Sequence, residues 1–424
     1  MNSALDDLRS RGLIAQTSDL AALQAHLASE PRTVYCGFDP TADSLHVGNL
    51  VPLLALRRFQ LAGHRPILLV GGATGLIGDP SGRSNERTLN DASTVSSWVD
   101  RIRHQVAPFL DFEGSAAALI VDNLQWTKEL RLIDFLRDIG KYFSVNAMIQ
   151  RDSVRSRLER EGDGISFTEF SYMLLQAMDY LHLAQTYNCS LQIGGSDQWG
   201  NIVSGMDLVR RKLHRESHAL TLPLVTKSDG TKFGKSASGA IWLDTAKTSA
   251  YAFYQFFVNT ADADVEHFIG YFTFMDQAAV SKAMLEHELA PERRLGQRTL
   301  ARELTRLVHG VLALQSAERI TQALFEGALT SLGETDLDQL AQDGMPVMRT
   351  VESELGLLDA LVRTGLAQSN SAARKLVGSA AIRVNGQVCS EPERQLKRSE
   401  ALHGRFFLIR RGKREWAMVE QTKG

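Results

Sequence analysis

The sequence has few cysteine residues, and their spacing argues against two kinds of site. Its 424 residues include three cysteines, Cys36, Cys189 and Cys389, and no two of them form a CxxC pair. A disulfide framework and a structural zinc site both need paired cysteines. We therefore expect neither, and we expect no protein-bound metal. Scarce cysteine is also typical of a reducing compartment, so the cytoplasm is the expected location.

Long hydrophobic runs are missing as well. No stretch of 18 or more apolar residues occurs, although 44% of the chain is apolar, so a membrane-spanning helix is not expected. The first thirty residues are polar and amphipathic and lack the apolar core of a secretory signal. We therefore expect no membrane partner. The length and the apolar content predict two or three domains with sizeable cores.

The chain as a whole has no large excess of one charge, but its last part has an excess of positive charge. The formal net charge is −2, yet residues 356–424 contain 13 Lys and Arg against 6 Asp and Glu, which leaves −9 on the preceding residues. A basic tail on an acidic body suggests a polyanionic partner for the tail. Charge alone leaves a solvated basic surface equally open.

The order of expected elements indicates a parallel α/β sheet. Residues 32–38 and 65–72 are short apolar runs bounded by Gly or Pro, which is typical of buried strands. The apolar stripe over 50–63 predicts a helix between them, and such a strand–helix–strand unit favours a right-handed crossover. Two further strands are expected at 117–123 and 189–197.

The rest of the chain suggests separate parts. Residues 357–379 predict two short helices, and an Asn-Gly pair after them predicts a hairpin. We expect an α/β domain over 1–244 with a mostly helical insertion at about 125–187, an all-helical domain over 245–321, a polar, glycine-broken linker over 322–354 and a small α+β module over 355–424.

Two phosphate-binding signatures are missing, and a third kind of anion site is suggested instead. "GGATGLIGDPSG" has neither GxGxxG nor GxxxxGK[ST] spacing, so it favours a tight turn over a dinucleotide or P-loop site. "TADSLHVGNL" places His46, Gly48 and Asn49 at a strand-to-helix junction. Helix N-terminal N–H groups attract anions there, and His46 adds a donor. Gly48 allows a flat ligand to approach the backbone.

A second candidate for holding phosphate is "SDGTKFGKSASG", residues 228–239. Lys232 and Lys235 stand three residues apart in a stretch rich in Gly and Ser that has no apolar face to bury. Such a loop can close over phosphates with its ammonium groups. A solvated surface loop is the alternative.

Polar side chains also occupy one face of an otherwise apolar helix. In "FTEFSYMLLQAMDYLHL", Tyr172, Gln176 and Asp179 fall at i, i+4 and i+7. Buried polar groups need partners, and the neighbouring Met and Leu residues already supply the packing. This face is therefore a candidate ligand site.

Together these stretches resemble the two signature motifs of class I aminoacyl-tRNA synthetases. "YCGFDPTADSLHVGN", "GGATGLIGDPSGRSNERT", "LLQAMDYLHL", "LQIGGSDQWGN" and "KFGKSASGAIWLD" are similar, in order, to the bacterial tyrosyl-tRNA synthetase family. The resemblance covers essentially the whole chain. Its last module is similar to the RNA-binding fold named after ribosomal protein S-four.

The resemblance implies a fold and an activity. The fold is a Rossmann-like parallel sheet with a helical insertion, followed by an all-helical anticodon-binding domain and the small RNA-binding module. The activity joins tyrosine and ATP into tyrosyl-adenylate and then charges the terminal adenosine of tRNA(Tyr). Mg²⁺ arrives with ATP. Members are homodimers, with the interface around 130–150.

The resemblance also implies a role for each candidate residue. Catalytic roles fall to Thr41, His46, Asn49, Arg83, Arg87, Lys232 and Lys235, most of them through contacts to the reacting phosphates. Tyrosine is held by Tyr35, Asp79, Asn123, Tyr172, Gln176, Asp179 and Gln198. ATP is held by Cys36, Gly37, Asp39, His46, Gly48, Gln192, Gly195, Asp197, Lys232, Phe233, Gly234, Lys235 and Ser236.

Two positions depart from the family pattern. Arg83 stands where many relatives have lysine, which keeps the charge but changes the geometry. Asn49 replaces the second histidine of the first motif, and its amide can still donate a hydrogen bond to the ribose.

Contacts to tRNA are suggested at two places. Arg151, Arg155 and Arg157 fit an acceptor-stem contact, although a salt-bridged exposed helix explains them equally well. In the last module, Arg374, Lys375 and Arg383 can hold phosphates.

Two other functions stay in view. A tryptophanyl enzyme would share the ATP motifs but is not expected to combine Tyr35 with Asp179. An RNA-binding or splicing protein that has lost aminoacylation is not expected to keep His46, Lys232, Lys235, Gln176 and Asp179 together.

Overall fold

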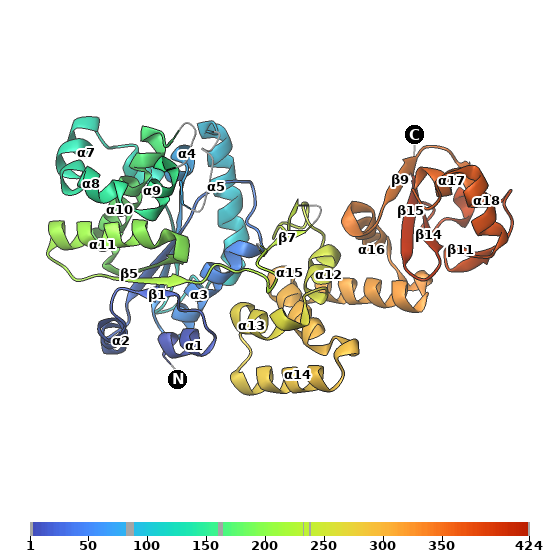
Figure 1. The fold of residues 1–424 in the computed structure, drawn as a ribbon, viewed down its shortest axis with the longest axis horizontal. Helices are drawn as coiled ribbons and strands as arrows, with labels where there is room; N and C mark the ends of the chain where they lie inside the picture. The colour runs from blue at the N-terminus through green and yellow to red at the C-terminus, as the bar shows by residue number, and fades with distance from the viewer. Residues whose placement is uncertain (1–2, 82–88, 160–163, 232, 237–238, 423–424) are drawn as a thin grey trace. The chain divides into compact units, whose positions relative to one another are not determined.

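The computed structural model describes residues 3–81, 89–159, 164–231, 233–236 and 239–422. The chain forms two compact units, each with its own interior. Unit 1 consists of Met1–Ala240 and Glu266–Asp276, and unit 2 of Ile241–Val265 and Gln277–Gly424. Among the described residues, no helix is both long enough and apolar enough to cross a membrane. Figure 1 shows the elements of both units, coloured in chain order.

Unit 1 is built around one sheet with the strand order β1-β6-β5-β2-β3-β4. Its edge strand β1 is antiparallel to β6, and the other neighbours are parallel. The strands are β1 (Gln16–Thr17), β2 (Thr33–Phe38), β3 (Arg65–Val70), β4 (Leu119–Asp122), β5 (Cys189–Gly195) and β6 (His218–Leu222). The predicted strands correspond to β2, β3, β4 and β5, so the predicted parallel sheet is confirmed.

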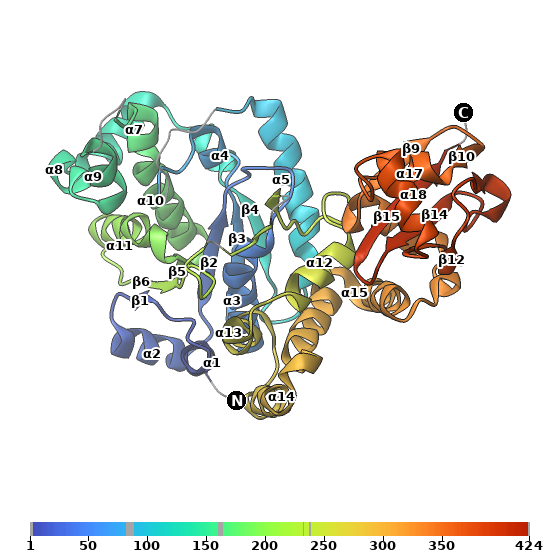
Figure 2. The same ribbon diagram turned by 45° about the vertical axis from the view of Figure 1, so that its right-hand side comes forward.

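Helices cover both faces of this sheet, which explains why its strands read as continuous apolar runs. The crossovers β2–α3–β3 and β5–α11–β6 run in opposite directions, so right-handed connections put α3 and α11 on opposite faces. Figure 2 shows α10 and α11 on one side of the sheet and α5 on the other. The helices are α1 (Ala4–Ser10), α2 (Leu20–Ser29), α3 (Leu50–Leu61), α4 (Thr74–Ile77), α5 (Ala92–Val106), α6 (Leu124–Thr127), α7 (Leu132–Asp138), α8 (Val145–Ile149), α9 (Asp152–Leu158), α10 (Phe167–Tyr187) and α11 (Trp199–Leu213).

The direction of the strand order reverses between β2 and β5. From β2 the chain proceeds through α3 to β3 on one side, whereas β5 pairs with β2 on the other side and proceeds to β6. In open α/β sheets such a reversal leaves a crevice at the carboxyl ends of the two strands. The carboxyl ends of β2 and β5 are Phe38 and Gly195, and both are followed by candidate site residues.

Unit 2 contains a group of helices followed by a small α+β module. The helices are α12 (Ala250–Val258), α14 (Gln277–Leu289), α15 (Leu295–Glu326), α16 (Glu334–Gln339), α17 (Leu357–Arg363) and α18 (Asn370–Gly378), while α13 (Asp262–Phe272) belongs to unit 1 from Glu266 onward. The module's main sheet has the order β12-β11-β14-β15-β9. Its strands are β9 (Val347–Thr350), β11 (Ile382–Val384), β12 (Gln387–Cys389), β14 (Phe406–Arg411) and β15 (Glu415–Gln421), and β10 (Glu354–Gly356) pairs separately with β13 (Gln395–Lys397). The predicted Asn-Gly hairpin is the β11–β12 connection.

The segment predicted as a linker, 322–354, is folded. It contains α16 and β9, and Leu337 and Leu340 have no exposed surface. Both leucines belong to a core cluster that also includes Ile320 of α15 and Phe406 of β14. The leucines form an apolar face, which is hard to recognise in the sequence because polar residues and glycines surround them. The segment is therefore part of the interior of unit 2 and not a spacer.

Candidate functional site

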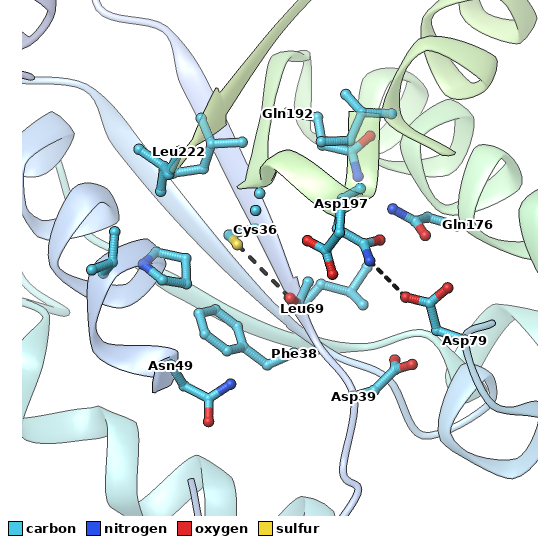
Figure 3. A pocket seen from close by; sticks show the side chains of 18 of the residues that line it. Cys36, Phe38, Asp39, Asn49, Leu69, Asp79, Gln176, Gln192, Asp197 and Leu222 are labelled. Carbon is cyan, nitrogen blue, oxygen red and sulfur yellow. Dashed lines mark hydrogen bonds between the residues drawn. The ribbon is translucent and has the colours of Figure 1, made fainter. Parts of the chain in front are cut away.

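A cavity of about 320 Å³ lies in unit 1 at the carboxyl ends of β2 and β5. Most of the residues that the sequence singled out line it: Tyr35, Cys36, Gly37, Asp39, Thr41, His46, Gly48, Asn49, Asp79, Tyr172, Gln176, Asp179, Gln192, Gly195, Asp197 and Gln198. Figure 3 shows Asp79, Gln176 and Asp197 on one side of the cavity and Phe38 and Asn49 on the other. Residues from four separate stretches thus meet in one place.

The first motif forms a closed hydrogen-bonded cap at the start of α3. The Gly48 N–H donates to Nδ1 of His46 (3.0 Å), and the His46 N–H donates to Oδ1 of Asn49 (3.1 Å). Because Nδ1 accepts a hydrogen bond, the neutral ring carries its proton on Nε2. A Cβ at Gly48 would come within 2.8 Å of the His46 ring. Glycine is therefore required here, and the amide oxygen of Asn49 holds the backbone that carries His46.

At the buried end of the cavity, Asp179 is held by two neutral donors. Asn123 Nδ2 donates to Oδ2 (2.9 Å) and the Trp126 indole N–H donates to Oδ1 (2.9 Å). Burial raises the pKa of Asp179 to about 7, although these two hydrogen bonds oppose the shift. Among the described residues this carboxylate has no basic partner, which is unusual for a buried acid.

The Tyr35 hydroxyl lies at the same end of the cavity. It is buried and has no hydrogen-bond partner among the described residues. Burial raises the pKa of Tyr35 well above its usual value, and the charge of nearby Asp179 adds to the shift. A buried polar atom left unpaired in this way indicates that a ligand supplies the missing partner.

A chain of hydrogen bonds connects Asp179 with Asp39. Tyr172 OH donates to Asp39 Oδ2 (2.7 Å) and Thr74 Oγ1 donates to Asp39 Oδ1 (2.7 Å). Asn123 Nδ2 in turn donates to Thr74 Oγ1 (3.0 Å) as well as to Asp179. The polar face of α10 is thus tied to the ends of β2 and β4.

Another group of oxygens collects around Asp79. Gln198 Nε2 donates to Asp79 Oδ2 (2.6 Å) and the Ser81 N–H donates to Oδ1 (3.0 Å). Gln176 Oε1 is buried and unpaired among the described residues. A carboxylate beside an unused amide oxygen suits an ammonium group, which brings three donors and no acceptor.

Sequence reasoning missed two polar residues and an apolar wall. Thr74 lines the cavity, whereas Trp126 supports Asp179 from beside it. The wall consists of Val51, Pro52, Leu222, Pro223, Leu224 and Val225. Trp126 follows the end of β4 at Asp122, and the position at the end of a parallel strand is the signal that could have identified it.

The lysine-bearing segment is described only in part. Lys232, Arg83 and Arg87 lie outside the described residues. Of Lys235 and Ser236 only the backbone is described, as strand β7 (Lys235–Ser236), which pairs with β8 (Gly239–Ala240). Phe233 is buried, and Gly234 lies against Val47 of the first motif. The roles expected for these lysines and arginines stay predictions.

The three arginines predicted to meet the acceptor stem differ in their surroundings. Arg157 is buried, faces Glu169 at 3.0 Å and donates to the Gly164 carbonyl. Its guanidinium therefore holds the protein interior together, and the predicted tRNA contact is corrected for this residue. Arg155 is exposed, 3.9 Å from Glu159, and Arg151 Nη2 donates to Ser204 (3.4 Å).

The basic residues of the last module are exposed. Arg374 and Lys375 lie on α18 and Arg383 lies on β11. Arg374 pairs with Glu393 (2.8 Å), and Arg383 donates to the Gly386 carbonyl (3.1 Å). Exposed ion pairs of this kind are weak, so they do not prevent a contact with phosphate.

Comparison with known proteins identifies relatives along nearly the whole chain. Residues 27–326 match the family described as tRNA synthetases class I (W and Y), and residues 336–419 match the tyrosine--tRNA ligase SYY-like C-terminal domain. The chain is 54% identical to the tyrosine--tRNA ligase of Dechloromonas aromatica over 98% of both chains. It is 56% identical to the tyrosine--tRNA ligase of Aeromonas hydrophila, again over 98% of both. The crystal structure of a C-terminally truncated mitochondrial tyrosyl-tRNA synthetase from Aspergillus nidulans matches with a TM-score of 0.70 and 32% identity, over 77% of this chain and 95% of that chain.

Proposed function

The chain belongs to the class I tRNA synthetases for tryptophan and tyrosine, and from that premise we propose that the cavity of unit 1 is where it activates tyrosine. The chain is a ligase that uses ATP: tyrosine and ATP give tyrosyl-adenylate and pyrophosphate, and the tyrosyl group then passes to the terminal adenosine of tRNA(Tyr). The observation that supports this site best is the buried Asp179 beside the unpaired Tyr35 hydroxyl.

These two groups suit a phenol and disfavour a benzene ring. A tyrosine hydroxyl donates to the Asp179 carboxylate and accepts from Tyr35. Phenylalanine would leave the Tyr35 hydroxyl unpaired and would give Asp179 no third donor, at a cost of about 1–3 kcal/mol for a polar group and more for a charged one. Rejection of phenylalanine by tyrosyl-tRNA synthetases is the standard illustration of this effect.

The opposite end of the amino acid fits the cluster around Asp79. Its ammonium donates to Asp79, Gln176 and Tyr172. Gln198 holds Asp79 at this end of the site, and Asn123 holds Asp179 at the phenol end. The amino-acid carboxylate is left pointing toward the first motif. It is already a nucleophile, so the first step needs no general base and depends on alignment.

ATP occupies the part of the cavity formed by β2, the first motif and the apolar wall. The adenine lies against the wall, and Cys36, Gly37, Asp39, Gln192, Gly195 and Asp197 surround the ribose and the α-phosphate. His46 donates from Nε2 to the departing phosphates, together with Thr41, Lys232, Lys235, Arg83 and Arg87. These donors stabilise the charge that grows on pyrophosphate, and Mg²⁺ enters with ATP as part of the substrate.

A homodimer is supported by an exposed apolar face in the insertion. Leu132 and Ile133 on α7 are 70% and 69% exposed, and Val145 on α8 is 56% exposed. Exposed apolar groups gathered in this way mark interaction surfaces. A second copy of the chain is the proposed partner. Since the product feeds protein synthesis, the cytoplasm is the proposed location.

Tyrosine-dependent exchange of pyrophosphate into ATP tests the activity directly. We expect exchange with tyrosine, and none with tryptophan or phenylalanine at the same concentration. Exchange with tryptophan would support a tryptophanyl enzyme. No exchange with any amino acid, but retained RNA binding, would support an RNA-binding protein without aminoacylation.

A further inference from the structure

A short segment within the region expected to be helical, residues 266–276, packs as part of unit 1. Residues 266–276 form the later part of α13 and the turn after it, and they belong to unit 1 although the residues on either side belong to unit 2. Phe268, Ile269 and Phe272 are almost completely buried. The arrangement of this segment is not explained by the cavity itself, because none of its residues lines it.

Two buried arginines hold the end of this segment through its carbonyl groups. Arg58, near the end of α3, donates to the Thr273 carbonyl (2.6 Å), and Arg11 donates to the carbonyls of Thr273 (3.2 Å) and Met275 (2.7 Å). Asp7 accepts from both arginines, at 2.9 Å from Arg58 and 2.7 Å from Arg11. Several directed bonds to carbonyl oxygens fix the position of a backbone more tightly than apolar contact alone.

The same segment forms an aromatic seat for Phe233. The Phe233 ring stacks on Phe272 with centroids 5.1 Å apart, and meets Phe268 edge-on at 4.7 Å. Phe233 stands between Lys232 and Gly234 in the sequence, in the stretch expected to carry the phosphate-binding lysines. The Phe233 N–H also donates to the Val225 carbonyl, in the apolar wall of the cavity.

Gly234 completes the contact with the first motif. Its φ of +85° is one that glycine adopts readily, and a Cβ there would lie 2.9 Å from Cγ2 of Val47. Val47 directly follows His46, and α3 runs from this motif to Arg58. These contacts form a closed series. The first motif leads through α3 to Arg58, Arg58 bonds the segment 266–276, and this segment holds Phe233, whose neighbour Gly234 lies against the first motif.

We propose that residues 266–276 are a positioning element, which sets the lysine-bearing stretch 228–239 against the first ATP motif. Phe268 and Phe272 hold this stretch through Phe233, and Arg58 anchors the segment to α3, the helix that follows the first motif. This inference rests on the proposed function of the cavity. Phe268, Phe272 and Arg58 are positioning residues, since they act through Phe233 and α3 and not on the substrates.

The proposal has a specific kinetic signature. Groups that stabilise the departing pyrophosphate act in the transition state, so a displaced lysine-bearing stretch lowers kcat more than it weakens tyrosine binding. The proposed tyrosine contacts come from other parts of unit 1, among them β2 and α10, and should stay in place. A displacement of about 1 Å can reduce a rate by about a hundredfold.

Substitutions at adjacent arginines supply a matched test in the full-length protein. Arg58→Lys keeps the charge, but an ammonium group cannot reproduce the fork by which Arg58 bonds both Asp7 and the Thr273 carbonyl. Arg57→Lys changes the neighbouring arginine, whose side chain donates to Gln60 and bonds no residue of the segment 266–276 among the described contacts. We expect Arg58→Lys to lower kcat for tyrosine-dependent exchange by about ten- to a hundredfold. Arg57→Lys should stay within twofold of the original protein. The dissociation constant for tyrosine, from equilibrium dialysis, should be unchanged in both.

A second pair of variants changes the ring of Phe233 itself. Phe233→Ser removes the ring from its seat and should lower kcat to a similar extent, while Phe233→Met keeps an apolar side chain there and should restore most of it. Thermal unfolding confirms that each variant is folded. Values of kcat within twofold of the original for both Arg58→Lys and Phe233→Ser would overturn the proposal. So would tyrosine binding that weakens in parallel with kcat. If the unmodified protein shows no tyrosine-dependent exchange, the proposed function fails instead.

Discussion

Each unit contains a buried carboxylate with little or no exposed surface, and the two are stabilised in opposite ways. Asp179 in unit 1 accepts hydrogen bonds from two neutral donors, Asn123 and Trp126. Asp336 in unit 2 accepts from both Nε and Nη2 of Arg319, and also from Ser316 and the Gly333 N–H. Burial raises the pKa of Asp179 to about 7. Burial acts in the same direction on Asp336, but the bonds from Arg319, Ser316 and Gly333 outweigh it and lower the pKa.

Under the proposed function, the difference separates a carboxylate that binds a ligand from one that stabilises the fold. Asp336 has its charge compensated within the protein and caps α16, so nothing further is needed. Asp179 has donors but no counter-charge among the described residues, and another donor would recover free energy that its desolvation costs. A tyrosine hydroxyl is such a donor. Both carboxylates are buried, so it is the charge of their hydrogen-bond partners that distinguishes the proposed functional carboxylate from the structural one.

The strongest test removes the ligand-binding carboxylate. In Asp179→Ala, the substrate hydroxyl loses a charged acceptor, which is worth about 1.5–3 kcal/mol. We expect kcat/KM for tyrosine to fall by about ten- to a hundredfold, and the preference for tyrosine over phenylalanine to collapse. Steady-state exchange kinetics with both amino acids measure it. Unchanged selectivity would remove Asp179 from the phenol site.

The matching substitution in unit 2 should change stability and leave selectivity alone. Asp336→Ala leaves Ser316 and the Gly333 N–H without their acceptor and removes a helix cap, at a cost of about 2–3 kcal/mol. Denaturant unfolding followed by circular dichroism measures it, with tyrosine-dependent exchange as the control. A change in amino-acid preference in this variant would contradict the assigned division of roles.

The two carboxylates should also make stability depend on pH with opposite signs. The pKa of Asp179 is raised from 3.8 to about 7, so its contribution to folding is fully present below pH 3.8 and is lost as the pH rises through about 7. The pKa of Asp336 is lowered, so its contribution is present above 3.8 and is lost as the pH falls through its folded pKa. Asp179→Asn should therefore flatten the decline of stability between pH 4 and 7, as unfolding curves at several pH values will show. An unchanged pH dependence would mean that Asp179 is already ionised across this range.

The smallest effect is expected from weakening one of the two donors to Asp179. Trp126→Phe removes the hydrogen bond to Oδ1, which favours the ionised form, so the pKa of Asp179 should rise further. The acid limb of kcat/KM for tyrosine should then move to higher pH by up to about one unit. A pH–rate profile of the variant beside the original measures the shift. A limb that moves to lower pH, or not at all, would show that Trp126 does not control this carboxylate.

Much of the candidate site was predictable because many of its residues belong to short local motifs. "TADSLHVGNL" contains its own cap, since His46, Gly48 and Asn49 bond to one another within four residues. The polar face of α10 follows from helical spacing. What escaped prediction depends on pairing between distant stretches. Thr74 contacts Asp39 across 35 positions, and Arg157 of α9 is buried against Glu169 of α10, a contact that the local pattern of neither helix records.

The sequence by itself determined which functional groups this protein has and in which local motifs they stand, because helix periodicity, turn residues and motif spacing act over a few neighbouring positions. Only the tertiary structure decided the state of those groups. Whether Asp179 is a poised acceptor or a paired acid depends on its burial and on Asn123 and Trp126, which stand more than fifty positions earlier in the chain. The same holds for residues 266–276, whose place on unit 1 follows from carbonyl groups meeting Arg11 and Arg58, and no local pattern records a contact between a backbone oxygen and a side chain more than two hundred positions away.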